Sequence, residues 1–404
     1  MDPETALSSW LDAAPNRERS GDFAGIRLDR YRRFLGFLPP PPAPCTVAGT
    51  KGKGSTVRLI EGALLAHGVP TIAFTSPHVR SVCERWRVDG IPVAAEVLLP
   101  LTRVVAAVEQ RSGIGLTYFE RTAALAVLLA ANRPGCQLLW EVGLGGRLDC
   151  ANALDCAVAV LTHLSHDHRD ILGPTLTHIA GEKLPIVRAG QPLLIAPQSA
   201  EAHAAIRSQL PLIVPASVPV TWVAREPRRF SLALSGEHQQ DNASTALAAV
   251  RLLLPQMDEQ LARRGMAGTA LAARCQLLTV GGRRILIDGA HNGPSVAATL
   301  AVAHQQLRPG WHLVLGLASD KEIDEILPLL TGLSEVVTIH RCGYESPRAR
   351  RAGDWPPALL AKPWHDSVRQ ALAALPAGDL CVTGSFYLAG EALQALDPRG
   401  SLPG

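Results

Sequence analysis

The glycine-rich stretch VAGTKGKGST (47–56) combines residue types that are suited to holding a phosphate group. It lies between an apolar run typical of a β-strand and a stretch with helical periodicity. Gly49, Gly52 and Gly54 would let the backbone turn tightly and point its N–H groups at an anion. Lys53 adds a mobile positive charge, and the N-terminus of the following helix adds a partial one. A tight strand-to-helix turn that binds no ligand is the alternative. However, a lysine followed by Gly-Ser-Thr in this context predicts a phosphate-binding loop.

The stretch THLSHDH (162–168) places three histidines and one aspartate within seven positions, which suggests a metal site. A zinc hydrolase of the metallo-β-lactamase type is one hypothesis. However, Ser165 stands where such an enzyme would have its second zinc histidine. The zinc hypothesis also leaves the phosphate-binding loop unexplained. A magnesium site that serves a bound nucleotide is the competing interpretation.

Two further segments end apolar runs with polar residues. Ser76, in the sequence TSPH, could contact a cation or a phosphate, although Ser-Pro-His is also an ordinary turn. Glu141, in WEVGLGGRLDCAN, ends a strand-like run, where an ionised carboxylate needs a metal ion or an arginine as partner. In the same segment, Arg147 and Asp149 could fix polar groups of a substrate, whereas a glycine-rich loop without a ligand is the alternative.

The elements that must position these residues alternate along the chain. Apolar runs at 44–49, 71–76, 137–143 and 156–162 are separated by stretches with helical periodicity. This pattern predicts a parallel sheet covered by helices on both faces. Ligands of such sheets bind beyond the carboxyl ends of the strands, which is where the polar loops described above would lie.

A second set of strands and helices is expected near the C-terminus. We expect these strands within 283–292, 311–321, 334–340 and 379–385, and helices at 294–306 and 321–330. Between the two sets, DNASTALAAVRLLLP is expected to form a helix capped by Asp241 or Asn242. A boundary near residue 270 gives one domain at 1–270 and a smaller one at 271–404.

The bulk composition is that of a folded globular protein. The chain has 404 residues, enough for two domains, with 47% hydrophobic and 19% charged residues. A net charge of +3 and 4% aromatic residues, without a basic stripe, argue against nucleic-acid binding. The eight cysteines have no zinc-ribbon or redox spacing. No signal peptide is recognisable and no apolar run reaches the roughly 20 residues that span a bilayer, so we expect a reduced, cytoplasmic protein.

The chain carries, in one order from about residue 20 to the C-terminus, the motifs VAGTKGKGS, TSPHV with ERWRVDG, LTYFE, EVGLGGRLD, DHRDILG, GEK, DNASTAL, LIDGAHN and TGSFYLAG. Together they resemble the folylpolyglutamate synthase/dihydrofolate synthase branch of the Mur ligase superfamily. The resemblance implies an α/β fold in which a parallel-sheet ATPase domain with a phosphate loop precedes a smaller Rossmann-like domain. It implies a monomer that uses ATP and Mg²⁺ to phosphorylate a folate or pteroate-type acid. The amine of an amino acid, typically glutamate, then displaces phosphate to form an amide.

The resemblance assigns nucleotide contacts to both domains. Lys53 and the phosphate loop would hold the phosphates, Asn242 would contact adenine, and Arg274 would touch a phosphate. Asp288 and His291 would serve the nucleotide and domain closure. The set implied to bind ATP is Gly49, Thr50, Lys51, Gly52, Lys53, Gly54, Ser55, Thr56, Asn242, Arg274, Asp288 and His291.

Ser76, Glu141 and His168 are the implied Mg²⁺ ligands. Lys183, in GEK, matches a lysine that is carbamylated in this superfamily and then binds a second Mg²⁺; an unmodified lysine that pairs with phosphate is the alternative. The implied catalytic set is Lys53, Glu141, His168 and Lys183. The other two histidines of THLSHDH would have no role in metal binding. The expected substrate contacts, which include an aromatic wall for a flat ring, are Phe119, Arg147, Asp149, Asn152 and Ser385.

Several departures from the family pattern lie near the expected acceptor site. Leu184 and Pro185 stand where Ala-Gly is usual, Cys275 replaces a phenylalanine, and His166 replaces a residue that is commonly aliphatic. These departures leave open a paralogue with the same chemistry that joins an amino acid to a non-folate acid in a specialised biosynthetic pathway. A kinase or a nucleotide-gated binding protein is a third hypothesis, and GEK and DGAHN argue against it because neither motif is needed merely to hold a nucleotide.

Overall fold

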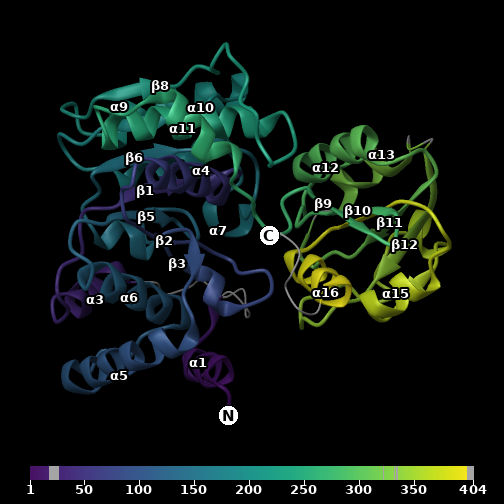
Figure 1. The fold of residues 1–404 in the computed structure, drawn as a ribbon, viewed down its shortest axis with the longest axis horizontal. Helices are drawn as coiled ribbons and strands as arrows, with labels where there is room; N and C mark the ends of the chain where they lie inside the picture. Colours follow the sequence, from purple (N-terminus) through teal and green to yellow (C-terminus); the bar gives the residue numbers. More distant parts are fainter. Residues whose placement is uncertain (18–26, 322, 332, 334, 398–404) are drawn as a thin grey trace. The chain divides into compact units, whose positions relative to one another are not determined.

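The computed structural model describes residues 1–17, 27–321, 323–331, 333 and 335–397. The chain divides into two compact units (Figure 1). The first unit comprises Met1–Leu232 and His238–Thr269, and the second comprises Ala233–Glu237 and Ala270–Gly404. The short segment Ala233–Glu237 therefore groups with the second unit although the chain on both sides of it belongs to the first.

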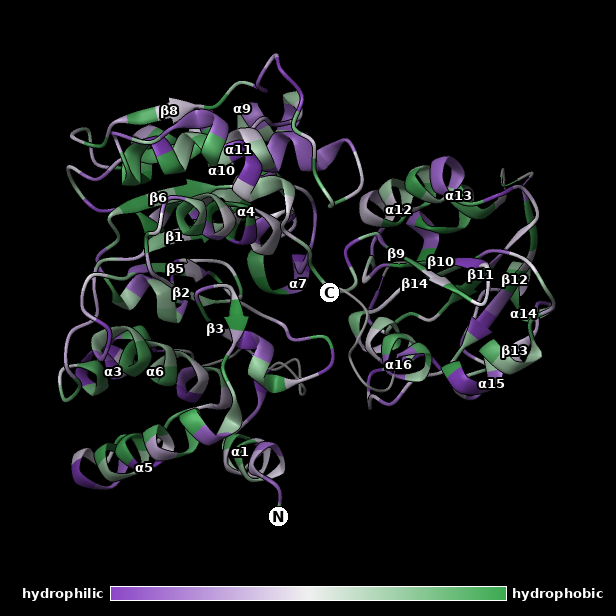
Figure 2. Ribbon diagram, viewed as in Figure 1, coloured by the Kyte–Doolittle hydropathy of each residue, from purple (hydrophilic) through white to green (hydrophobic). Residues whose placement is uncertain are grey.

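The first unit is built on an eight-stranded sheet with the order β4-β3-β2-β5-β1-β6-β7-β8. The neighbouring strands β2, β5, β1, β6, β7 and β8 pair in parallel. Strands β3 and β4 extend the sheet beyond β2 with antiparallel pairing. Strands β1, β2 and β6 are buried at every residue and β5 at all but its first, as expected for a sheet covered on both faces, and β6 is coloured as hydrophobic in Figure 2. Their bounds are β1 Cys45–Ala48, β2 Thr71–Phe74, β3 Trp86–Val88, β4 Ile91–Pro92, β5 Gln137–Glu141, β6 Val158–Leu161, β7 Leu193–Ile195 and β8 Val220–Trp222.

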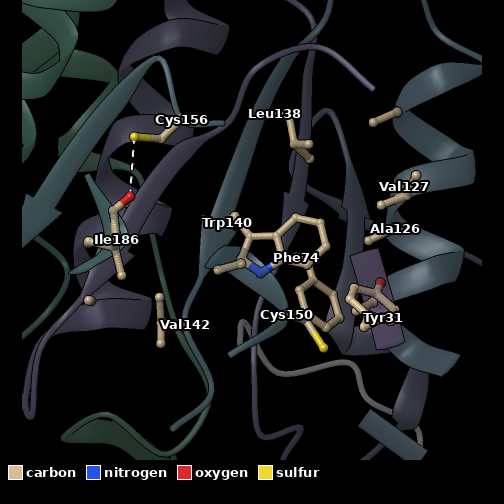
Figure 3. Close-up of a cluster of buried hydrophobic side chains, with 14 of the residues drawn as sticks. Tyr31, Phe74, Ala126, Val127, Leu138, Trp140, Val142, Cys150, Cys156 and Ile186 are labelled. Carbon is tan, nitrogen blue, oxygen red and sulfur yellow. Dashed lines mark hydrogen bonds between the residues drawn. The ribbon is translucent and has the colours of Figure 1, made fainter. Parts of the chain in front are cut away.

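Helices of the first unit pack on this sheet and on one another. Helix α4 contacts β1, β2 and β5 and is itself covered by α10 and α11, while α6 contacts β2. Figure 3 shows the aromatic part of the core, where the rings of Phe74 and Trp140 lie 4.7 Å apart. The longer helices are α1 (Pro3–Asp12), α3 (Leu28–Leu35), α4 (Lys53–Ala66), α5 (Ala95–Ser112), α6 (Tyr118–Ala131), α8 (Leu176–Lys183), α9 (Ala200–Ile213), α10 (His238–Leu253) and α11 (Glu259–Ala267).

The second unit contains a six-stranded sheet with the order β13-β12-β11-β14-β10-β9. All pairs are parallel except β9 with β10, which form an antiparallel pair. The strands are β9 Gln276–Val280, β10 Arg283–Ile287, β11 Trp311–Leu315, β12 Val336–Cys342, β13 Trp364–His365 and β14 Leu380–Thr383. The helices are α12 Gly293–Gln306, α13 Leu327–Thr331, α14 Pro357–Leu360, α15 Val368–Ala374 and α16 Phe386–Leu396.

The α/β class and the two parallel-rich sheets confirm the predicted fold, and two local predictions are wrong. Helix α10 begins at His238, so Asp241 and Asn242 lie inside the helix and do not cap it. The single helix expected at 321–330 is divided into a short 3-10 helix, Ile323–Glu325, and α13, since Pro328 cannot donate to the preceding turn and favours a helix start just before it. None of the described helices is long and apolar enough to cross a membrane.

Candidate active site

The polar loops of the first unit gather at one edge of its sheet. Strands β2, β5, β1 and β6 are consecutive neighbours and run in parallel, so their carboxyl ends lie side by side. Ser76 follows β2, Glu141 ends β5, the glycine-rich loop follows β1, and THLSHDH follows β6. This is the edge at which open α/β sheets bind ligands.

The glycine-rich loop has a conformation that side chains would not permit. Gly49 and Gly52 have positive φ angles of 147° and 85°. A Cβ atom on Gly52 would lie 2.2 Å from Oδ1 of Asn242, and one on Gly49 would lie 1.9 Å from Oγ1 of Thr162. The two glycines are therefore required both by backbone geometry and by close packing.

The N–H groups of the loop divide into two sets. Those of Thr50 and Lys51 donate to the carbonyl oxygen of His163, over 3.0 and 3.1 Å, and so hold the loop to the chain after β6. The N–H groups of these two residues are therefore already used within the protein. Helix α4 begins at Lys53, and no described side chain caps its N-terminus. The first amides of α4 are thus the ones suited to a phosphate.

Glu141 is a buried carboxylate directly beside this helix start. Its Oε2 atom accepts the N–H of Ser76 over 3.1 Å. The residue as a whole is 3% exposed. A Cβ atom on Gly54 would lie 3.3 Å from the same Oε2, so the glycine lets the carboxylate approach the loop. The arrangement places an oxygen ligand next to the phosphate-binding amides.

Lys183, the last residue of α8, is buried in the same region of the first unit. Burial, together with the positive charge of Lys53, lowers the pKa of its ammonium group to about 7. Asp149 is also buried, and burial raises the pKa of its carboxyl group to about 6, against the opposing effect of backbone N–H donors and of Lys53. Lys53 thus acts electrostatically on both groups.

The THLSHDH segment does not form a zinc cluster. Among the residues that the structure describes, no group of three or more His, Cys, Asp or Glu side chains is arranged to hold a metal ion. The carbonyl of His163 anchors the glycine-rich loop, and the ring of His166 lies 3.6 Å from Oε1 of Glu201. Asp167 pairs with Lys51 over 3.1 Å, and His168 begins the short helix α7 (Arg169–Leu172) as its N-cap residue.

Three of the predicted substrate contacts have partners within the protein. Both Nε and Nη2 of Arg147 donate to Glu182. Asp149 accepts the N–H groups of three residues of its own loop, 143, 144 and 151. Asn152 accepts from Arg188 through its side-chain oxygen, over 2.7 Å. These residues shape the loop after β5.

Phe119 and Asn242 also pack within the first unit. The Phe119 ring lies 5.7 Å from that of Phe74 and against Gly143, where a Cβ atom would be 2.6 Å from its Cζ. It is only partly buried. Asn242 is buried, donates to Gln239 over 2.9 Å, and lies against the glycine-rich loop.

In the second unit, predicted site residues follow the carboxyl ends of the neighbouring parallel strands β10 and β14. Asp288 follows β10 and Ser385 follows β14. Asp288 is buried and accepts from the N–H groups of residues 275 and 290 and from the hydroxyl of Thr299. The guanidinium carbon of Arg274 lies 4.5 Å from the centre of the Phe386 ring. The ring of His291 lies 6.1 Å from the same aromatic ring, and Ser385 caps α16.

Sequence reasoning gave no role to two residues that the structure ties to the site. Thr162 packs against Gly49, and its hydroxyl donates to the carbonyl of Ala48 over 3.1 Å. Asp167 pairs with Lys51 of the glycine-rich loop. An acidic residue directly before a candidate metal-binding histidine, opposite a lysine-rich loop, was the signal that could have identified Asp167.

No protein-family model matches the chain. The dihydrofolate synthase/folylpolyglutamate synthase of Escherichia coli (strain K12) is 33% identical over 417 residues, which cover 98% of this chain and 96% of that protein. Among solved structures, E. coli FolC in complex with DHPP and ADP aligns with a TM-score of 0.84 and 29% identity over 98% of both chains. A bifunctional folylpolyglutamate synthase/dihydrofolate synthase with Mn, AMPPNP and L-glutamate bound aligns with a TM-score of 0.83 and 26% identity, again over 98% of both chains. The chain therefore belongs to the dihydrofolate synthase/folylpolyglutamate synthase family of the Mur ligase superfamily.

Proposed function

We propose that this protein is an ATP-dependent ligase that joins glutamate to a folate or pteroate-type acid through an acyl phosphate. The observation that carries the proposal is the gathering of an uncapped helix N-terminus after a glycine-rich loop, a buried carboxylate and a buried lysine in one unit. The relatives support the substrates, since one was solved with DHPP and ADP and another with AMPPNP and L-glutamate.

The chemistry requires two transfers. A carboxylate oxygen of the acid attacks the γ-phosphorus of ATP, and the bond from that phosphorus to the β–γ bridging oxygen breaks to release ADP. The amine of glutamate then attacks the acyl carbon, phosphate leaves with the electron pair of the C–O bond, and the nitrogen loses a proton. Phosphoryl transfer depends mainly on positioning and charge neutralisation. In this chain, Lys53 and the start of α4 would provide both.

The residues beside the loop fit a magnesium site. Glu141 offers a buried carboxylate and Ser76 a hydroxyl group, and hard oxygen donors are what Mg²⁺ prefers. We propose that Ser76, Glu141 and His168 hold this ion, which when bound neutralises negative charge on the phosphates. Lys51, Thr50, Ser55 and Thr56 belong to the same nucleotide-binding loop.

Lys183 is suited to carbamylation. A neutral amine can attack carbon dioxide, forming an N–C bond and releasing a proton, and the lowered pKa makes the neutral form available near pH 7. The positive charges of Lys53 and Lys51 would favour the carbamate anion, against the negative charges of Asp167 and Asp149. The carbamate would then hold a second Mg²⁺.

We further propose that the first unit is the ATP-binding and catalytic domain and that the second is the C-terminal Mur ligase domain. Asn242 in the first, and Arg274, Asp288 and His291 in the second, would bind the nucleotide. The proposed substrate-binding residues are Phe119, Arg147, Asp149, Asn152 and Ser385. We also propose that the protein is a monomer in a reducing cytoplasm, and the eight free, buried cysteines support the reducing compartment.

An ATP-turnover screen tests this function. Candidate acids, including dihydropteroate and reduced folates, would be combined with amino acids, including glutamate, in the presence of Mg²⁺. ADP and phosphate should form only when acid and amine are both present. AMP and pyrophosphate would refute the acyl-phosphate chemistry. If folate-type acids fail and another acid works, the paralogue alternative replaces the folate proposal.

A further inference from the structure

Asp167 links the phosphate loop to the chain that carries His168. Its Oδ2 atom lies 3.1 Å from Nζ of Lys51, and the side chains are 10% and 24% exposed, respectively. The pair is therefore largely shielded from solvent, where an ion pair is screened less than at the surface. It joins a residue of the loop after β1 to one of the loop after β6.

The second oxygen of the same carboxylate acts on the backbone of His168. Asp167 Oδ1 accepts the His168 N–H over 3.0 Å. His168 has φ 50°, a left-handed conformation that is unfavourable for residues other than glycine. The imidazole Nε2 lies 3.9 Å from the same oxygen, beyond hydrogen-bonding distance. The carboxylate thus supports the backbone conformation from which the ring projects.

Further bonds fix the same two loops together. The N–H groups of Thr50 and Lys51 donate to the carbonyl of His163, and the Thr50 hydroxyl donates to the carbonyl of Ser165 over 3.1 Å. The backbone that leads into Asp167 from its N-terminal side is consequently fixed relative to the glycine-rich loop. Movement of the loop would be passed to His168 through these contacts.

We infer that Asp167 is a positioning residue that, through Lys51 and the His168 backbone, aligns the His168 imidazole with the phosphate loop for metal binding. This inference rests on the proposed function, in which His168 is a Mg²⁺ ligand and the loop holds ATP. Groups that orient a metal ligand commonly change metal affinity by about 10–100-fold when they are removed. Asp167 would act in this way without touching the metal or the nucleotide.

The test is Mn²⁺ binding to the full-length protein in the presence of AMPPNP, followed by electron paramagnetic resonance of free Mn²⁺. Asp167→Ala should weaken Mn²⁺ binding about 10–100-fold. Asp167→Asn should weaken it less, because the amide oxygen can still accept the His168 N–H while the ion pair to Lys51 is lost. The matched control is Asp170→Ala, which removes an exposed acidic group three residues away and should leave Mn²⁺ affinity within about twofold.

AMPPNP binding measured with EDTA should be similar in wild type and Asp167→Ala, because the role concerns the metal ligand. Wild-type Mn²⁺ affinity in Asp167→Ala, or an equal loss in Asp170→Ala, would overturn the inference and leave the proposed function standing. If the alanine variant does not fold, wild-type affinity in Asp167→Asn would refute the contribution of the Lys51 pair. A wild-type protein that binds neither AMPPNP nor Mn²⁺ would instead refute the proposed function itself.

Discussion

Replacing Lys183 by alanine is expected to lower ADP formation by about 100-fold while leaving the fold intact, because the variant loses the proposed carbamate ligand. The pKa of Lys183 is about 7, against 10.5 for an ordinary lysine. At pH 8 about nine-tenths of the amine is then neutral, compared with roughly three in a thousand for an unperturbed lysine. Burial therefore raises the reactive fraction about 300-fold.

Carbon-13 NMR of protein equilibrated with ¹³C-bicarbonate measures the modification directly. The wild type should show one carbamate signal that Lys183→Ala lacks, and removing carbon dioxide should lower wild-type activity reversibly. A short carboxylate such as butyrate should partly restore Lys183→Ala, since it supplies a negative oxygen ligand to the space that the side chain vacates.

Two results would refute this reasoning. One is wild-type activity that is indifferent to carbon dioxide and lacks a carbamate signal. The other is a pH dependence of stability typical of a free buried amine. Because the folded-state pKa is lowered, the folded state binds fewer protons, so an unmodified Lys183 would make stability rise from about pH 7 to 10.5 relative to Lys183→Met.

Gly52→Ala should sharply weaken AMPPNP binding in a calorimetric titration, because the new Cβ atom would lie 2.2 Å from a buried side-chain oxygen. Gly68→Ala, also at positive φ but in open space, is the control and should cost only about 1–2 kcal/mol of stability; equal AMPPNP affinities in both variants would contradict the role of Gly52. In the second unit, His312, His340 and His365 form a hydrogen-bonded chain that also contains one threonine hydroxyl. Burial lowers the pKa of all three rings, so the folded state binds fewer protons and stability should fall as the pH drops through the unfolded value of 6.5. Urea unfolding at pH 7.5 and 5.5 measures this, and a pH-dependent loss that persists unchanged in His340→Gln would rule out the chain as its source.

The sequence predicted strands β1, β2, β5 and β6 and the order of the polar loops, because apolar runs and glycine-rich turns are local signals. It did not predict β3, β4, β7 and β8 of the same sheet, which have only two or three residues each. Ser76, Glu141 and the glycine-rich loop each end or follow a buried run, and the parallel pairing of β2, β5, β1 and β6 brings these ends together. The apolar residues that precede a polar residue in the sequence thus predict that it lies at the end of a strand.

The partners of individual side chains could not be predicted in the same way. The carboxylate of Asp149, a predicted substrate contact, accepts N–H groups from its own loop, and the sequence does not reveal these bonds. The amides of Thr50 and Lys51 bond to a carbonyl more than 100 positions away. Such bonds depend on how the loops of separate strands meet, and residue type alone does not specify that geometry.

The central claim is that the acid is activated as an acyl phosphate, and oxygen transfer tests it most directly. An acceptor acid labelled with ¹⁸O in both carboxylate oxygens would be converted with ATP and glutamate, and the phosphate would be examined by mass spectrometry. One ¹⁸O atom should appear in each phosphate released, because the attacking carboxylate oxygen leaves with the phosphorus. Unlabelled phosphate, or label in AMP, would contradict the account.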